Sequence, residues 1–212
     1  MMMPCIDALV LAGGENRRFP TQKAFADIGN GRSIDAIIGL LSGVSRKLYL
    51  SANSPEQFFP LGIPMIGDLL TVRGPFNGIY SALKATGSPV LLAAACDTPL
   101  VSGGLLRLLA QRHRGQDAVV PVFEGRVQPL PGIYSAGLLS RMKTLADSGR
   151  CGLRELLDGA DVCRISEEEI RGIDPDGRSF MSINTVEDYQ RLAGLLAGTR
   201  SAGHERPYSL KR

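Results

Sequence analysis

Histidine and cysteine are scarce in this sequence, which restricts the chemistry it can perform. The 212 residues include two histidines, His113 and His204, so we expect neither a histidine-centred catalytic triad nor a histidine-rich metal site. The four cysteines are Cys5, Cys96, Cys151 and Cys163. Their spacing matches neither a zinc ribbon nor a Cys-x-x-Cys redox pair, and we therefore expect reduced, structural thiols.

A strong charge imbalance and a long apolar run are also missing. Lysine and arginine number 24 against 21 aspartates and glutamates, and the net charge of +3 is too small to indicate a nucleic-acid partner. No apolar run approaches the length of a membrane span, and residues 1–7 lack the pattern of a secretion signal. We therefore expect a cytoplasmic protein that binds neither nucleic acid nor membrane; a small anionic ligand would suit its charge.

The length and composition predict one folded domain. A chain of 212 residues with 44% hydrophobic and 21% charged side chains can bury an ample core. We place the domain at residues 1–198, because residues 199–212 are polar, basic and typical of a flexible tail. We find no internal repeat and no second domain.

Apolar strand-like runs alternate with helical patterns along the chain. The runs that predict strands are residues 8–12, 47–52, 64–66, 89–96, 117–123, 160–165 and 180–184. The patterns that predict helices are residues 33–41, 79–85, 103–114, 138–146, 152–157 and a last helix that ends at 196. This alternation is typical of an α/β fold, in which helices cover a mostly parallel sheet.

Three local predictions accompany this pattern. The run at 89–96 is apolar throughout, so we expect it to be central in the sheet. Residues 126–134 contain two prolines that cannot donate ladder hydrogen bonds, and we expect an edge strand or a substrate-facing arm there and not a central strand. Ser33 is a suitable cap for the helix that begins with it.

The most informative stretch is the strand at residues 8–12 and the loop that follows it. The strand runs into Gly13 and Gly14, whose lack of a Cβ lets main-chain N–H groups approach a ligand. Arg18 and Lys23 follow within the reach of this loop, a combination that suits a phosphate chain. The spacing matches neither Gly-x-x-x-x-Gly-Lys-Ser/Thr nor Gly-x-Gly-x-x-Gly. An ordinary turn with solvated arginines stays an open alternative.

Polar residues follow the predicted strands at their carboxyl ends, where open parallel sheets bind ligands. Asn53 and Asp68 follow the second and third strands, although each could also be a turn or cap residue. Asp97 follows the predicted central strand, where a carboxylate can hold a divalent cation that bridges phosphate oxygens, and we favour this role over a turn cap. Asn184 and Thr185 precede the last helix and could simply initiate it.

The residues that carry these features occur in a consistent order. They are Leu11-Ala-Gly-Gly, Arg18, Lys23, Asn53, Asp68, Gly74-Pro75 with Gly78, Cys96-Asp97-Thr-Pro99, Gln128-Pro129 and Ile183-Asn184-Thr185. The set spans about residues 6–195 and resembles the molybdenum cofactor guanylyltransferase family. Any single piece is weak, whereas the ordered set is fairly specific.

The resemblance implies a fold, an activity and a set of site residues. The fold is a single three-layer α/β/α Rossmann-like nucleotidyltransferase domain with a mostly parallel central sheet. The activity is the transfer of GMP from GTP to molybdenum-bearing molybdopterin, with Mg²⁺ and with release of pyrophosphate. The matching positions are Leu11, Ala12 and Gly13 for the GTP-binding turn, Lys23 for the phosphates, Asn53 and Asp68 for the nucleoside, Asp97 for Mg²⁺ and Asn184 for a second polar group near the metal.

The chemistry of this reaction agrees with the residues present. Attack of a phosphate monoester on the α-phosphate of a nucleoside triphosphate brings two polyanions together, so catalysis is chiefly positioning and charge neutralisation. Arg18 and Lys23 would neutralise the phosphates, and the amides of Gly13 and Gly14 would cradle them. Asp97 would hold Mg²⁺ on the reacting group. We therefore expect Arg18, Lys23 and Asp97 to be the catalytic residues.

Other activities on the same donor site stay open. One alternative is a related nucleotidyltransferase that uses GTP or CTP and another phosphorylated acceptor; another is a nucleotide-binding protein without catalysis. Pro20 and Gln22 stand where the family usually has glycine and aspartate, and Pro20 stiffens the phosphate loop. The candidate contacts to the acceptor are Arg126, Gln128 and Arg154. We expect a monomer or a weak homo-oligomer.

Overall fold

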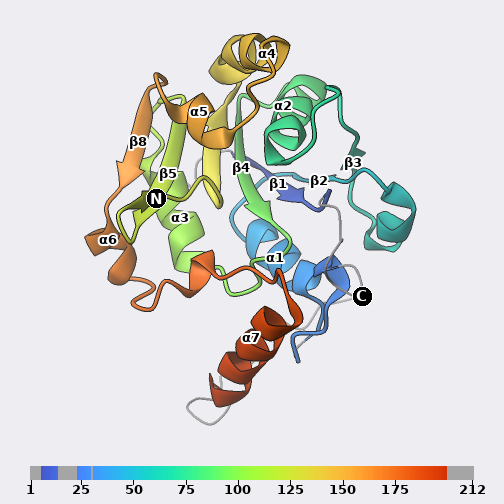
Figure 1. Cartoon of the computed structure of the whole chain (residues 1–212), viewed down its shortest axis with the longest axis vertical. Coiled ribbons are helices and arrows are strands. Elements are labelled where there is room, and N and C mark those ends of the chain that lie inside the picture. Colours follow the sequence, from blue (N-terminus) through green and yellow to red (C-terminus); the bar gives the residue numbers. More distant parts are fainter. Residues whose placement is uncertain (1–5, 14–22, 30, 200–212) are drawn as a thin grey trace.

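The computed structural model describes residues 6–13, 23–29 and 31–199. Its strands form an eight-stranded sheet with helices on both faces (Figure 1), which confirms the predicted α/β class. The strand order is β3-β2-β1-β4-β7-β5-β6, and β8 pairs with β5. The strands are β1 Asp7–Leu11, β2 Leu48–Ser51, β3 Met65–Ile66, β4 Val90–Ala95, β5 Ala118–Phe123, β6 Arg126–Val127, β7 Gly132–Ser135 and β8 Val162–Ile165.

Helices and short 3-10 turns connect the strands and cover the sheet. The α-helices are α1 Ser33–Ser42, α2 Pro75–Thr86, α3 Gly103–Arg112, α4 Leu139–Asp147, α5 Leu153–Leu157, α6 Glu167–Arg171 and α7 Val186–Thr199. The 3-10 helices are η1 Lys23–Phe25, η2 Pro55–Leu61, η3 Ala136–Leu138 and η4 Arg178–Phe180. Each helix within the described residues is too short or too polar to span a lipid bilayer.

The sheet is parallel at one end and mixed at the other. β1 pairs in parallel with β2 and β4, and β2 pairs in parallel with β3, so β4 lies near the middle of the order as predicted. The prediction that residues 126–134 hold no central strand is wrong for their last part, because β7 lies antiparallel between β4 and β5. Pro129 and Pro131 both precede β7, so neither removes a hydrogen bond from its ladder.

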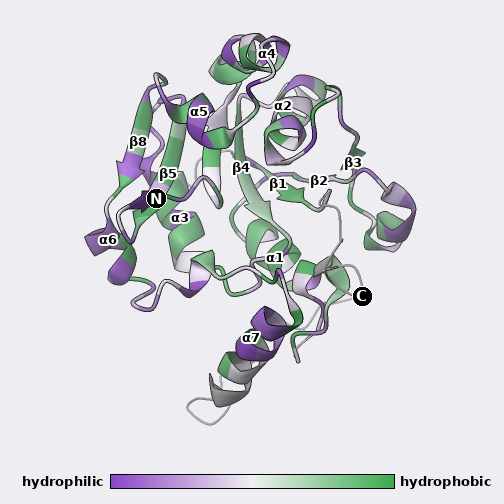
Figure 2. Ribbon diagram, in the orientation of Figure 1, coloured by the Kyte–Doolittle hydropathy of each residue, from purple (hydrophilic) through white to green (hydrophobic). Residues whose placement is uncertain are grey.

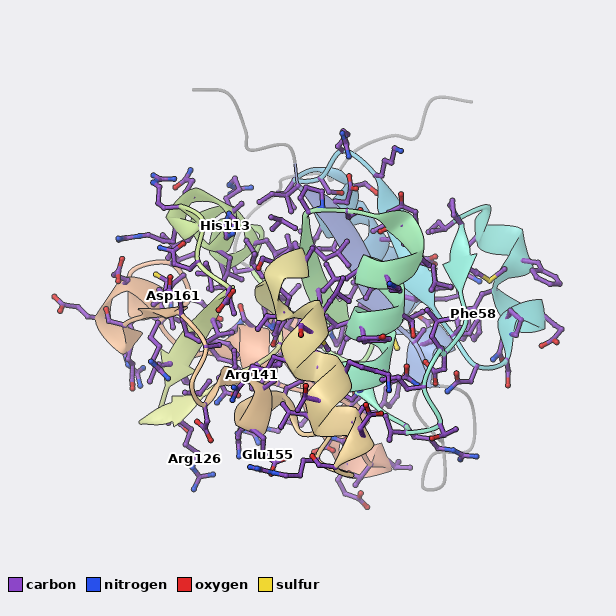
Figure 3. The ribbon with its side chains drawn as sticks, turned by 90° about the horizontal axis from the view of Figure 1, so that it is seen from above. Phe58, His113, Arg126, Arg141, Glu155 and Asp161 are labelled. Carbon is purple, nitrogen blue, oxygen red and sulfur yellow. The ribbon has the colours of Figure 1, made fainter. Side chains whose placement is uncertain are left out.

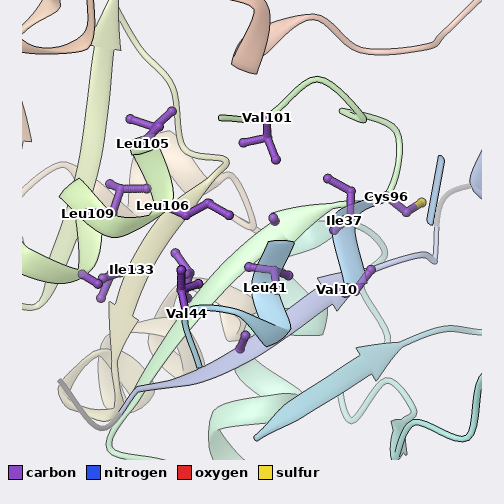
Figure 4. Close-up of a cluster of buried hydrophobic side chains, with 14 of the residues drawn as sticks. Val10, Ile37, Leu41, Val44, Cys96, Val101, Leu105, Leu106, Leu109 and Ile133 are labelled. Atoms are coloured by element: carbon purple, nitrogen blue, oxygen red, sulfur yellow. The ribbon is translucent and has the colours of Figure 1, made fainter. Parts of the chain in front are cut away.

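Alternate residues of the buried strands build two cores, one on each face of the sheet. On β1, Ala8 and Val10 pack with side chains of α1 and α3, whereas Leu9 and Leu11 pack with side chains of α2, α4 and α5. Figure 4 shows the first core, to which Cys96 contributes a buried, unoxidised thiol. Figure 2 shows mostly hydrophobic residues along the inner strands β1, β4 and β5, and many hydrophilic ones on the helices that cover the sheet.

Three other local predictions are wrong. Residues 180–184 form no strand; instead the main-chain N–H of Ile183 donates to the carbonyl of Asp97 at 2.8 Å, which ties this segment to the end of β4. Ser33 is not the helix cap, because Arg32 occupies that position and the buried Ser33 hydroxyl donates to the carbonyl of Cys96 at 2.6 Å. The second helix begins at Pro75, a residue suited to a first turn, and not at Ile79.

The amino end of β1 is held by a buried charge network. Asp7 is 2% exposed, and its carboxylate accepts two hydrogen bonds from Arg46, both at 3.1 Å, and one from the hydroxyl of Ser88 at 2.5 Å. Burial alone would raise the pKa of Asp7, but the bonds from Arg46 and Ser88 outweigh it and hold the pKa below its ordinary value of 3.8. The network joins the starts of β1 and β4, at the opposite end of these strands from Asp97.

Loss of this carboxylate should weaken the fold in a pH-dependent way. Because the folded pKa of Asp7 is lowered, its stabilisation is present above the unfolded pKa and is lost as the pH falls through the folded pKa. We expect Asp7→Asn to lower the free energy of unfolding by about 2 kcal/mol at pH 7. Urea titrations at pH 7 and at pH 3 should show the difference from wild type shrinking at the lower pH. Asp147→Asn, in the exposed Lys143–Asp147 pair, is the control and should cost little at either pH.

Gly78 lets α2 approach the sheet closely. A Cβ on Gly78 would lie 2.6 Å from the Cδ2 of Leu11 and 2.7 Å from the Oγ of Ser51, on β1 and β2. Neither distance is compatible with normal contact, so the helix must carry glycine there. Gly39, inside α1, has no heavy atom within 4 Å of such a Cβ.

These two glycines should respond in opposite directions to the same substitution. We expect Gly78→Ala to lower the free energy of unfolding by about 1–3 kcal/mol, because the helix must move away from the strands. Gly39→Ala should raise it by roughly 0.5–1 kcal/mol, because alanine is the better helix former and meets open space. Urea denaturation of both variants measures this. Equal effects of the two changes would contradict the close approach.

Candidate active site

A cavity of about 720 Å³ opens at the carboxyl ends of β1, β2, β3 and β4. This is the edge of the sheet where open α/β folds bind ligands. One wall follows these strands and is made of Leu11, Ala12, Gly13, Ser51, Asn53, Asp68, Ala95, Cys96, Asp97 and Thr98, with Ala24, Gly74 and Pro75 beside them. The far wall is made of Pro129, Leu130, Cys151, Gly152, Leu153, Arg154, Phe180 and Ser182.

The structure brings most of the predicted donor-site residues to this one cavity. The lining includes Leu11, Ala12, Gly13, Asn53, Asp68 and Asp97. Gly14 and Arg18 lie outside the described residues, as do Pro20, Gln22 and the predicted tail from residue 200 onwards. The backbone of Lys23 begins η1, directly before Ala24, which lines the cavity. The structure does not describe the Lys23 side chain.

Among the predicted donor-site residues whose side chains the structure describes, Asn184 lies beside the cavity and not in its wall. Its side chain donates to the hydroxyl of Ser182, which does line the cavity, at 2.6 Å. The carboxylate of Asp188 accepts from the main-chain N–H groups of Asn184 and Thr185, and the Thr185 hydroxyl accepts from Asp188 N. This is a capping box, so helix initiation accounts for Thr185.

Asn53 and Asp68 form a polar pair in the first wall. The Asn53 side chain donates to the carbonyl of Gly13 at 3.4 Å. Burial raises the pKa of Asp68, and a hydrogen bond from the Asn53 side chain partly offsets this rise. A Cβ on Gly13 would lie 3.4 Å from the Asn53 amide nitrogen, which is an ordinary van der Waals distance. The pair offers a carboxylate and an amide to a ligand in the cavity.

Main-chain hydrogen bonds fix the position of Asp97. The N–H of Cys96 donates to the carbonyl of Leu11 at 3.0 Å, and the carbonyl of Asp97 accepts from Ile183 at 2.8 Å. The hydroxyl of Thr98 donates to the carbonyl of Ala95 at 3.0 Å and closes the turn after β4. Asp97 is therefore half-buried beside the turn that follows β1, on the cavity wall.

Aromatic contacts anchor the segment that begins at Lys23. The ring of Phe25 stacks on Phe58 with centroids 5.2 Å apart, and the guanidinium of Arg32 lies 5.3 Å from the Phe25 centroid. The Tyr189 hydroxyl on α7 donates to the carbonyl of Asp27. Together these contacts fix where the lysine-bearing chain enters the site.

The far wall depends on residues that sequence analysis did not identify. The fully buried Tyr134 donates its hydroxyl to the carbonyl of Pro129 at 2.6 Å and so holds the segment before β7 against the cavity. Arg141 on α4 donates to the carbonyls of Leu156 and Asp158 and holds α5, which Figure 3 shows beside it. No sequence pattern marks either residue, because each acts through a carbonyl whose position depends on the fold.

The candidate acceptor contacts separate in space. Arg154, at the start of α5, lines the cavity. Arg126 is exposed and points away from the body of the protein (Figure 3), and neither it nor Gln128 is part of the cavity wall. Of the three candidates, only Arg154 is placed to meet a ligand in this cavity.

Comparison with known proteins gives the family of this chain. The family model described as the MobA-like NTP transferase domain matches residues 8–166. The chain belongs to this family. The MobA-like NTP transferases are nucleotidyltransferases, and the sheet edge with its cavity is consistent with that enzyme class.

The similarity to known MobA-like NTP transferases and to solved structures covers nearly the whole chain. A molybdenum cofactor guanylyltransferase of Desulfosudis oleivorans is 30% identical over 199 residues, covering 92% of this chain and 98% of its own. A probable molybdenum cofactor guanylyltransferase of Bacillus subtilis is 32% identical, with coverages of 87% and 92%. The crystal structure of molybdopterin-guanine dinucleotide biosynthesis protein A from Archaeoglobus fulgidus superposes with a TM-score of 0.78 at 23% identity, covering 91% and 100%. The predicted fold and enzyme class are thereby confirmed.

Proposed function

We propose that this enzyme transfers GMP from GTP to molybdenum-bearing molybdopterin, with Mg²⁺, and releases pyrophosphate. The observation that carries the proposal is the convergence of the turn at Gly13, the Asn53–Asp68 pair and Asp97 on one cavity. The relatives described as molybdenum cofactor guanylyltransferases support the same donor and acceptor. We further propose a cytoplasmic enzyme that acts as a monomer or a weak homo-oligomer.

The donor half of the cavity would bind the nucleotide. The main chain from Leu11 to Gly13, with Gly14, would approach the phosphates, which Arg18 and Lys23 would neutralise. Asp68 and Asn53 would bind the nucleoside. A carboxylate accepts hydrogen bonds well from the ring N–H and amino group of guanine, whereas the corresponding ring nitrogen of cytosine carries no hydrogen. This difference is the physical basis for preferring GTP over CTP.

Asp97 suits a magnesium ion that takes most of its ligands from the bound nucleotide and water. In the described residues, no group of three or more histidine, cysteine, aspartate or glutamate side chains could hold a metal by itself. Mg²⁺ typically keeps one or two protein carboxylates and takes its other ligands from phosphate oxygens and water, so a cavity with Asp97 in its wall fits this ion. When bound there, the ion would neutralise charge on the phosphate that is transferred.

The reaction needs no nucleophilic side chain. The terminal phosphate oxygen of the acceptor would form a bond to the α-phosphorus of GTP, and the bond from that phosphorus to the bridging oxygen of the β-phosphate would break. Pyrophosphate leaves with the electron pair of the broken bond. Arg154 in the far wall would orient the anionic acceptor, and the donor wall would hold the triphosphate for in-line attack.

Nucleotide selectivity tests the donor assignment. We expect Mg²⁺ with GTP at about 100 times its Kd to raise the Tm by roughly 5–10 °C, because a ligand that binds only the folded form stabilises it. CTP at the same concentration should give a much smaller shift. Differential scanning fluorimetry with both nucleotides measures this, and equal shifts would remove the guanine assignment.

Product analysis tests the acceptor. Incubation with labelled GTP, Mg²⁺ and molybdenum-loaded molybdopterin should yield a labelled dinucleotide and pyrophosphate. A thermal shift without pyrophosphate release would instead favour a nucleotide-binding protein without catalysis. Pyrophosphate release only with a different phosphorylated acceptor would favour a related nucleotidyltransferase.

Removal of the Asp97 carboxylate should strongly slow turnover and leave the fold intact. Asp97→Ala keeps the main-chain carbonyl that accepts from Ile183, so the segment after η4 should stay in place. We expect pyrophosphate release to fall by about 10²–10³-fold, since a ligand to the charge-neutralising metal is lost. Asp147→Ala on α4 removes an exposed carboxylate and should leave the rate unchanged. Turnover by Asp97→Ala at the wild-type rate would exclude Asp97 from the metal site.

A further inference from the structure

The loop that carries Asp68 contains no regular secondary structure. It runs from Gly67 to Gly74, between β3 and α2, and includes no strand or helix. Such a segment has no ladder to satisfy its main-chain N–H and C=O groups, and its position depends on individual partners. Asp68 lies at its start and faces the cavity beside Asn53.

Two side chains of α2 supply partners for this loop. The Asn77 amide nitrogen donates to the carbonyls of Leu70 at 2.8 Å and Val72 at 2.6 Å, and its oxygen accepts from the N–H of Leu70 at 3.2 Å. The Ser81 hydroxyl accepts from the N–H of Leu69 at 2.8 Å. Four main-chain groups directly after Asp68 are thus bonded to one helix.

The two side chains complete a closed and buried network. Asn77 and Ser81 are both 0% exposed and lie one helical turn apart on α2, among apolar residues such as Phe76 and Ile79. The Ser81 hydroxyl donates to the oxygen of Asn77 at 2.9 Å, so the amide uses both of its N–H groups and accepts two bonds. A carboxamide buried beside aliphatic side chains would be costly without these bonds. The network therefore specifies one loop conformation over others.

We propose that Asn77 and Ser81 are positioning residues for nucleoside recognition: they hold the loop 67–74 so that Asp68 stays beside Asn53 at the cavity wall. The inference rests on the proposed role of this cavity in binding GTP. On this proposal, the buried side chains of Asn77 and Ser81 affect nucleotide affinity and base selectivity, although neither lines the cavity. Phosphate contacts, which come from the turn after β1, are not part of the network.

A matched pair of serine variants separates this role from general stability. Ser81→Ala removes the partner of Leu69 N–H, and Ser88→Ala removes a similarly buried hydroxyl, 3% exposed, from the Asp7 network at the other end of the sheet. We expect Ser81→Ala to weaken GTP binding about fivefold by calorimetry, as the loss of one buried hydrogen bond implies. The KM for GTP should rise while kcat at saturating GTP is retained. Ser88→Ala should lower the Tm and leave GTP binding unchanged.

Two further readouts complete the test. Tripolyphosphate, which has no nucleoside, should bind Ser81→Ala and wild type equally. In the protein without nucleotide, amide hydrogen exchange of residues 67–74 should rise in Ser81→Ala and more so in Asn77→Ala, and stay at the wild-type level in Ser88→Ala. Wild-type GTP affinity in both Ser81→Ala and Asn77→Ala, or an equal loss of tripolyphosphate binding, would overturn the inference. If the wild-type protein bound no GTP, the proposed function would be overturned instead. The hydrogen-exchange result would then show only whether Asn77 and Ser81 order the loop.

Discussion

The pairing of β1 with β4 is the constraint on which the site depends. Leu11 lies opposite Ala95 in this parallel register, and the N–H of Cys96 extends the ladder to the carbonyl of Leu11. Because alternate residues of both strands belong to different cores, a slip by one residue would exchange the contents of the two cores. The register therefore places Gly13 and Asp97 at the same sheet edge, in the wall of one cavity.

Single polar side chains, fully buried for Asn77 and Tyr134 and half-buried for Arg141, hold other parts of the cavity wall. Asn77 holds the loop with Asp68, Tyr134 holds the segment at Pro129, and Arg141 holds α5. Each of these side chains belongs to a strand or helix and donates to carbonyls of an irregular segment or of a short helix. Such contacts fix the shape of the cavity before a ligand binds, which reduces the ordering cost of binding.

The pattern of apolar residues predicted most strands and helices, because the spacing of apolar residues and the length of a run can be read from a short segment alone. The strand at 8–12, the central strand at 89–96 and the helix at 33–41 agree with the structure within one or two residues. The predictions fail where the conformation of a segment depends on contacts with residues far away in the sequence. Residues 180–184 look like a strand, but Ile183 bonds to the end of β4. The two prolines before β7 suggest an edge, but the strand begins after them and lies between β4 and β5.

The sequence by itself determined the α/β class and placed Gly13, Asn53, Asp68 and Asp97 at one sheet edge, because in a parallel sheet the residues that follow each strand must gather there. It also carried an ordered set of motifs that resembled a nucleotidyltransferase family, and the family model matches residues 8–166. Only the tertiary structure decided that β7 enters the sheet, that Arg154 and not Arg126 reaches the cavity, and that Asn77 supports Asp68. These depend on contacts between segments that packing brings together, and no local pattern of residues encodes them.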